Sequence, residues 1–261
     1  MPGPGEGEHR LERSCLSPSS PGVGGWVGAG EEGRGDEGPG HRHPQLDIPR
    51  RTDHVPIVAL PAIFQTALAP IRRQRFPAPG EEGSRTILFD IETLRSAAEV
   101  GGWNKAHRMG VAIGVICHLE EGRFEIFPET GVRALVDALR AATLVIGFNI
   151  RRFDYHVLSG YTGEDFSRLL PTLDLLEDLH SRLGFRVGMG HLAQETLGTA
   201  KSADGLQSLE WVRQGRLDLV EAYCRKDVEI LRDLYLHGRR EGFLFYRDKK
   251  RDVRLRLPVE W

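Results

Sequence analysis

Regular patterns of hydrophobic and polar residues begin only after Ser84. The first three patterns are rich in β-branched and aromatic residues and predict strands over Thr86–Thr93, Gly110–His118 and Arg123–Phe127. The turn-forming sequence Glu-Glu-Gly separates the last two, which indicates a hairpin. We therefore expect the ordered part of the chain to start with antiparallel strands.

Helical spacing of hydrophobic residues follows, in alternation with short apolar runs. A stripe of apolar side chains predicts a helix over Val132–Ala142. The other predicted elements are a buried strand at Thr143–Phe148, a helix at Phe153–Ser159, a short strand and a helix within 171–184, and a long helix at Leu217–Gly238. This order predicts an α/β fold with a mixed sheet flanked by helices.

Composition divides the 261-residue chain into three regions. Residues 1–52 are rich in Gly, Pro, Ser, Glu and Arg and poor in apolar side chains, which predicts a disordered tail. Residues 53–84 are mildly apolar but broken by prolines, so we expect a linker that is at most partly ordered. Residues 85–261 are then left to form one globular domain.

Charge and cysteine content narrow the function classes. The formal net charge of −2 gives no basic field like that of many nucleic-acid-binding proteins, although metal ions can supply positive charge locally. Cys15, Cys117 and Cys224 stand far apart without CxxC spacing, so we expect neither a zinc site nor a disulfide framework. With no signal peptide and no apolar run of about 18 residues, we expect a cytoplasmic protein without membrane contact.

Two carboxylates interrupt the first predicted strand. Because side chains alternate along a strand, Asp90 and Glu92 point to the same side as Leu88, while Phe89 and Ile91 point to the other. Like charges this close raise each other's pKa unless a positive group lies between them, and a divalent metal ion is the usual one. A pair of exposed carboxylates on an edge strand is the alternative interpretation.

Further candidate residues follow a later strand and lie on the last helix. Asn149 directly follows the strand at Thr143–Phe148, and Asp154 starts the next helix. Asp154 belongs either to a site at the strand ends or is only a helix N-cap. Tyr223 and Asp227 are four residues apart on the final helix and project from one side of it. They form either part of a site or a hydrogen-bonded surface pair.

Taken in order, these motifs resemble those of proofreading 3′–5′ exonucleases. DxE at 90–92, NxxxFD at 149–154 and YxxxD at 223–227 match the subclass with a tyrosine in the last motif (DEDDy), and Ala222 stands where the other subclass has histidine. The second motif has the form seen in the exonuclease domains of family B DNA polymerases. Segments such as "GFNIRRFDYHVLSGYT" and "YCRKDVEILRDL" resemble the YprB-like group of ribonuclease-H-like exonucleases. The resemblance covers about residues 85–261 and implies a ribonuclease-H-like fold.

The resemblance also implies a hydrolase mechanism that uses two ions of Mg²⁺ or Mn²⁺ to release nucleoside 5′-monophosphates from a 3′ end. By analogy, Asp90 would bridge the ions, Glu92 and Asp227 would complete the first site, and Asp154 would hold the second. Tyr223 would orient the attacking water. Hard carboxylate ligands without a histidine or thiolate set match these cations.

The expected partner is nucleic acid, either DNA or RNA, with single-stranded 3′ ends favoured because the terminal base must leave its stack to reach the metals. The candidate substrate contacts are Asn149, Arg151, Arg152, Lys201 and Lys226. The alternative is that Asn149 only caps a turn and that the four basic residues are solvated surface charges. Two other functions stay open. One is a catalytically idle nucleic-acid-binding domain of the same fold, and the other is a structure-specific endonuclease.

Three remaining features carry no site. Asp174 matches none of the four ligand positions, so we assign it no metal. His191 is expected to pack or to cap a helix. The basic and then apolar segment 247–261 is either an edge strand or a solubilising end of the chain.

Overall fold

The computed structural model describes residues 83–199, 205–248 and 250–261. The expected tail at 1–52, all but the end of the expected linker, and Lys201 lie outside the described residues. In chain order the elements are β1 Thr86–Thr93, α1 Ala97–Val100, the 3₁₀ helix η2 Trp103–Arg108, β2 Val111–His118, β3 Arg123–Pro128, the 3₁₀ helix η3 Glu129–Gly131, α2 Val132–Ala141, β4 Leu144–Gly147, α3 Asp154–Thr162, α4 Phe166–Leu169, β5 Thr172–Asp174, α5 Leu175–Leu183, α6 Met189–Leu197, α7 Gly205–Arg213, α8 Leu217–Glu241, β6 Phe243–Asp248 and β7 Val253–Pro258.

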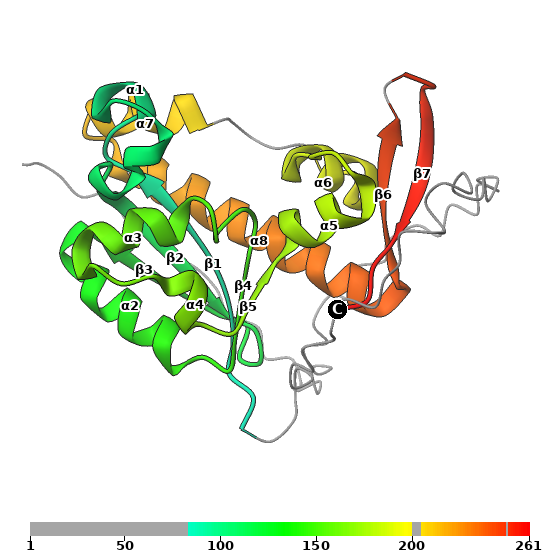
Figure 1. Cartoon of the computed structure of the whole chain (residues 1–261), viewed down its shortest axis with the longest axis horizontal. Helices are drawn as coiled ribbons and strands as arrows, with labels where there is room; N and C mark the ends of the chain where they lie inside the picture. Colours follow the sequence, from blue (N-terminus) through cyan, green and yellow to red (C-terminus); the bar gives the residue numbers. More distant parts are fainter. Residues whose placement is uncertain (1–82, 200–204, 249) are drawn as a thin grey trace, which may run out of the picture. The chain divides into compact units, whose positions relative to one another are not determined.

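Five of these strands form one mixed sheet in the order β3-β2-β1-β4-β5 (Figure 1). β2 runs antiparallel to both of its neighbours, β1 and β3, which confirms the expected hairpin. β1, β4 and β5 are parallel to one another. The expected α/β fold with a mixed sheet is thus confirmed, and the carboxyl ends of its three parallel strands meet at one edge.

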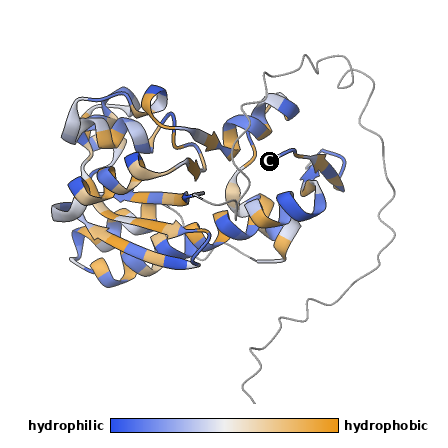
Figure 2. Cartoon of the chain, turned by 90° about the horizontal axis from the view of Figure 1, so that it is seen from below, coloured by the Kyte–Doolittle hydropathy of each residue, from blue (hydrophilic) through white to orange (hydrophobic). Residues whose placement is uncertain are grey.

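Helices cover both faces of this sheet. Leu88 and the inward side chains of α8, including Val228 and Leu231, form one apolar cluster. Phe89 and Ile91 belong to the cluster on the opposite face, which includes buried residues of α2 and α3. The alternation expected for the first strand is therefore confirmed. The strands are predominantly hydrophobic, whereas the helices also carry hydrophilic residues (Figure 2).

The last part of the chain forms a second, two-stranded sheet. β6 and β7 pair antiparallel, and the backbone N–H of Phe245 donates a hydrogen bond of 2.9 Å to Thr196 of α6. For 247–261 the sequence left an edge strand and a solubilising end open; the structure has the strand β7 there, and its partner β6 was not predicted. His191, which was expected to pack or to cap a helix, accepts a hydrogen bond through its Nε2 from the backbone N–H of Arg247 at 2.9 Å and so joins α6 to β6.

Most predicted boundaries agree with the structure to within one residue. Two helices are longer than predicted, since α3 continues to Thr162 and α8 to Glu241. In both cases a glycine in the left-handed conformation, Gly163 or Gly242, ends the helix. A search of the described helices finds none with the length and apolar character needed to cross a membrane.

Candidate metal centre

Three carboxylates meet at the end of β1. Asp90 and Glu92 of β1 and Asp227 of α8 each present an oxygen, and these oxygens all lie within 4.8 Å of one another. Asp227 is 4% exposed, and the other two are half-buried. Among the described residues, this is the group whose geometry suits a metal ion.

Strand register places the pair on β1 where its parallel neighbour has ended. β4 pairs with β1 only as far as Leu88, so the N–H groups beyond that point need another partner on this side. The side chain of Asp154 supplies one, since its Oδ1 accepts a hydrogen bond of 3.3 Å from the backbone N–H of Ile91. The first residue of α3 therefore provides the hydrogen-bond acceptor that β4 no longer provides beyond Leu88.

The turn from β4 to α3 is tight, and its residue types explain why. A Cβ on Gly147 would lie 2.1 Å from the side chain of Ile150, so only glycine fits there. Asn149 has a φ of 72°, in the left-handed region that asparagine tolerates better than most residues. This turn directs Asp154 back towards β1.

Asp174 holds the turn in place. This buried side chain is the N-cap of α5 and accepts hydrogen bonds from the backbone N–H groups of Leu176 and Glu177. It also accepts from the N–H groups of Asn149 at 2.8 Å and Arg151 at 3.0 Å. A single carboxylate thus satisfies four backbone donors from two segments. The sequence assigned Asp174 no metal, and the structure shows this supporting role in the turn.

Helix α8 brings the last motif to the same edge. Tyr223 and Asp227 are each 4% exposed, which excludes the alternative of a surface pair. The ring of Tyr223 meets that of Trp211 edge-on, with 6.1 Å between centroids. Cys224, which follows Tyr223 in the sequence, donates from its thiol to the backbone oxygen of Asp90 at 3.4 Å. That contact ties α8 directly to β1.

Burial controls the protonation of Asp154, which is 2% exposed. Burial is the main cause that raises the pKa of its carboxyl group to about 8. The negative charges of Asp174 and Glu92 act in the same direction, against hydrogen bonds from its own backbone and from Ile91 that lower the pKa. Without a cation, this side chain is therefore mostly protonated at neutral pH. A bound cation would favour the ionised form.

The four carboxylates all affect the pKa of the Cys224 thiol. Burial raises its pKa well above the usual range, and the charges of Asp90, Glu92, Asp227 and Asp154 act in the same direction. The thiol is consequently neutral and acts as a hydrogen-bond donor. The structure thus brings together the four acidic residues that the sequence singled out, although Asp154 lies outside the group within 4.8 Å.

The candidate substrate contacts differ in how far their side chains already interact within the protein. The guanidinium of Arg151 donates to the backbone oxygens of Ser167 at 2.7 Å and Thr172 at 3.0 Å, and Lys226 pairs with Glu229 at 3.3 Å. The side-chain oxygen of Asn149 accepts a hydrogen bond from Arg186 at 2.7 Å, and Arg152 is exposed. Their roles in substrate binding stay predictions.

Sequence reasoning missed two residues that support this site. From the sequence, Cys224 was expected only to belong to no zinc site or disulfide, and Asp174 was assigned no metal. The sequence "PTLDLL" does carry the signal for Asp174, because an aspartate before a run of helix formers is a typical N-cap. The bonds from Asp174 to the distant turn have no such signal in the sequence.

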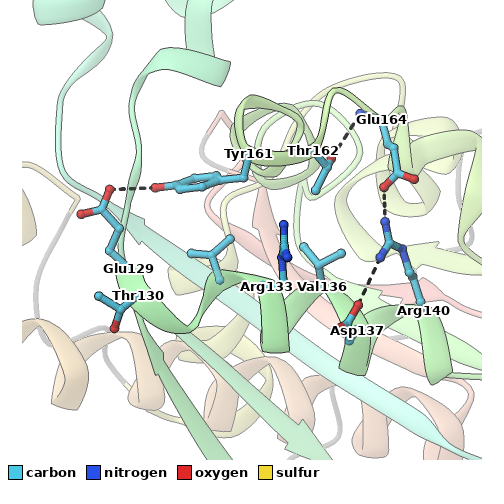
Figure 3. A pocket seen from close by; sticks show the side chains of 10 residues that line it. Glu129, Thr130, Arg133, Val136, Asp137, Arg140, Tyr161, Thr162 and Glu164 are labelled. Carbon is cyan, nitrogen blue, oxygen red and sulfur yellow. Dashed lines mark hydrogen bonds and ion pairs between the residues drawn. The ribbon is translucent and has the colours of Figure 1, made fainter.

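A cavity of about 630 Å³ lies elsewhere, between α2 and the end of α3 (Figure 3). Tyr161 donates to Glu129 at 3.1 Å on one side of it, and Arg140 pairs with Asp137 and Glu164 on the other. None of the four acidic residues near the end of β1 lines this cavity. The candidate metal centre therefore does not lie in this cavity.

Comparisons with known proteins leave the chain without an assigned family. No protein-family model matches the sequence, and no curated protein does so either. Three carboxylates that share a half-buried corner can hold a metal ion, because a cation removes the repulsion among them.

Proposed function

We propose that this chain is a metal-dependent 3′–5′ exonuclease of ribonuclease-H-like fold, related to the YprB-like exonucleases. The observation that carries the proposal is the convergence of Asp90, Glu92 and Asp227 from elements far apart in the sequence. The mixed sheet in which β2 alone runs against the other four strands supports the proposed fold.

The donor set fits a hard divalent cation. Each of the three side chains offers a carboxylate oxygen, and the group contains neither histidine nor cysteine. Such ligands suit Mg²⁺ or Mn²⁺ better than Zn²⁺. When bound, two such ions would supply positive charge at the attacked phosphate and activate water at neutral pH.

The residues of the chain would then have distinct tasks. Asp90, Glu92 and Asp227 would bind the cations, and Asp154 would ionise to complete the second site. The hydroxyl of Tyr223 would orient the attacking water by a hydrogen bond, without needing to ionise. Hydrolysis would release a nucleoside 5′-monophosphate from a single-stranded 3′ end.

Removing one carboxylate charge tests the proposal. We expect the wild-type protein to shorten 5′-labelled DNA or RNA oligomers from the 3′ end in Mn²⁺ or Mg²⁺. Asp90→Asn and Asp227→Asn should each lower the rate at least about a hundredfold, which corresponds to roughly 2.7 kcal/mol of transition-state stabilisation. Gel analysis of the labelled products measures this rate.

Asp137→Asn is the matched control, because Asp137 is an exposed α2 carboxylate outside the site. It should retain full activity, and circular dichroism should show that all three variants fold. Full activity in either site variant would refute the proposal. A circular substrate that is cut would instead select the endonuclease.

A further inference from the structure

Trp103 is an unusually exposed aromatic residue. It starts η2, and 71% of it is accessible to solvent. Its ring meets Phe153 nearly edge-on, with 5.8 Å between centroids, and Phe153 in turn packs against the core on the α2 and α3 face of the sheet. One side of the indole is therefore supported while most of it faces solvent.

This aromatic pair is connected to the first strand through Asp154. Phe153 directly precedes Asp154, whose carboxyl group accepts the hydrogen bond from Ile91 of β1. Ile91 lies between Asp90 and Glu92. A chain of direct contacts and covalent neighbours thus links the exposed indole to the carboxylates.

The element that carries Trp103 is held firmly. A Cβ on Gly160 of α3 would lie 1.9 Å from the backbone oxygen of His107, so η2 approaches α3 as closely as glycine allows. The rings of His107 and His156 also meet, with 5.5 Å between centroids. Ala106 and Met109 anchor the same segment in the core. A ring carried on a firmly held segment loses less entropy when a flat ligand stacks on it than a ring on a mobile segment does.

Basic residues are neighbours of Trp103 and of its ring partner in the sequence. The sequence of η2 contains Lys105 and Arg108 but no acidic residue, and Arg152 is next to Phe153. Within the described part of the chain, none of these three cations forms an ion pair with a carboxylate. Aromatic rings flanked by such cations suit single-stranded nucleic acid, whose bases stack while its phosphates are neutralised.

We propose that Trp103 is a stacking platform for a nucleobase near the 3′ end of a single-stranded substrate, with Lys105, Arg108 and Arg152 along the phosphates. The proposal rests on the function proposed above and names a binding site for its substrate. Stacking on Trp103 would hold the unpaired end of the strand beside the carboxylates.

Equilibrium binding tests this site apart from hydrolysis. The full-length Asp90→Asn protein is titrated, with Mn²⁺ present, into a 5′-labelled 12-nucleotide DNA, and fluorescence anisotropy reports binding. Two strands are compared, one with normal and one with abasic nucleotides at the 3′-terminal positions. Trp103→Ala should weaken binding of the normal strand roughly tenfold, and Trp103→Phe should retain most of the affinity. The abasic strand should bind equally weakly to the protein that keeps Trp103 and to the Trp103→Ala variant.

Leu169→Ala is the control, since Leu169 is 59% exposed but lies on α4, which precedes the amino end of β5. It should leave both affinities unchanged. If Trp103→Ala weakens normal and abasic strands equally, or weakens neither, the stacking role is wrong. The indole then only packs against Phe153. Absence of hydrolysis by the wild-type protein, with the base-dependent binding intact, would contradict only the exonuclease activity.

Discussion

Asp154 shows how one residue can be costly to the folded protein and useful to a site. Its carboxyl group is 2% exposed, and burial raises its pKa to about 8. In the unfolded chain an aspartate has a pKa near 3.9. At Asp154 the folded state therefore binds more protons between these two values, and the contribution of this group to the free energy of unfolding falls as pH rises from about 4 to 8.

We expect Asp154→Asn to remove this penalty in metal-free protein, because asparagine resembles the protonated carboxyl group and cannot ionise. The variant should gain stability relative to wild type as pH rises, by on the order of 2 to 4 kcal/mol between pH 5 and pH 8. Urea denaturation in EDTA at both pH values measures the difference. A gap between the two proteins that is the same at both pH values would contradict the raised pKa.

At the scale of elements, the turn between β4 and α3 depends on a side chain from another segment. Asp174 accepts hydrogen bonds from the N–H groups of Asn149 and Arg151 and also caps α5. Loss of its carboxylate would leave these donors buried or half-buried without an acceptor. Each such donor costs about 1 to 3 kcal/mol, and loss of an N-cap costs about 1 kcal/mol.

Asp174→Ala should accordingly lower the free energy of unfolding by at least about 3 kcal/mol. Asp174→Asn should cost less, because the side-chain oxygen that remains can still accept from Asn149, Leu176 and Glu177. Chemical denaturation measures both values.

Asp165→Ala provides the comparison, since Asp165 is also an N-cap, of α4, but is exposed and accepts from the backbone N–H of Ser167. We expect it to cost only about 1 kcal/mol. Equal losses for Asp165→Ala and Asp174→Ala would show that Asp174 acts as an ordinary cap and does not support the turn.

At the scale of the whole molecule, the candidate centre exists only when the sheet and α8 are assembled. α8 packs across one face of the sheet through Val228 and Leu231, and this packing sets Asp227 against β1. A cation that joins the two elements should therefore stabilise the assembled fold. A ligand that binds only the folded state at a hundred times its dissociation constant adds about 2.7 kcal/mol.

Millimolar Mn²⁺ should raise the melting temperature of the wild-type protein by roughly 5 to 10 °C if it reaches that degree of saturation. The double variant with Asp90→Asn and Asp227→Asn should respond much less. Differential scanning fluorimetry with Mn²⁺ or EDTA measures the shift. A shift of the same size in both proteins would place the ion elsewhere, and no shift in wild type would favour an idle domain.

Local information in the sequence determined most of the elements and all of the acidic candidates. Alternation identified β1 and the face of Asp90 and Glu92, and helical spacing placed Tyr223 and Asp227 on one side of α8. These patterns can be recognised in the sequence because side chains return to the same face of a strand or helix within a few residues. The pairing of β6 with β7 was missed, since an edge pairing between short strands has little local signal.

Only the tertiary structure decided which candidates meet. The end of β4 at Gly147 leaves the N–H of Ile91 for Asp154, and the contact of Cys224 with Asp90 fixes α8 at the same corner. The sequence offered Asp154 as either an N-cap or part of a site; Phe153 is the N-cap of α3, and Asp154 accepts its hydrogen bond from β1, so its role in a site stays a prediction. Protonation, close approach and shared burial depend on distances between segments far apart in the chain, and no local pattern encodes those distances.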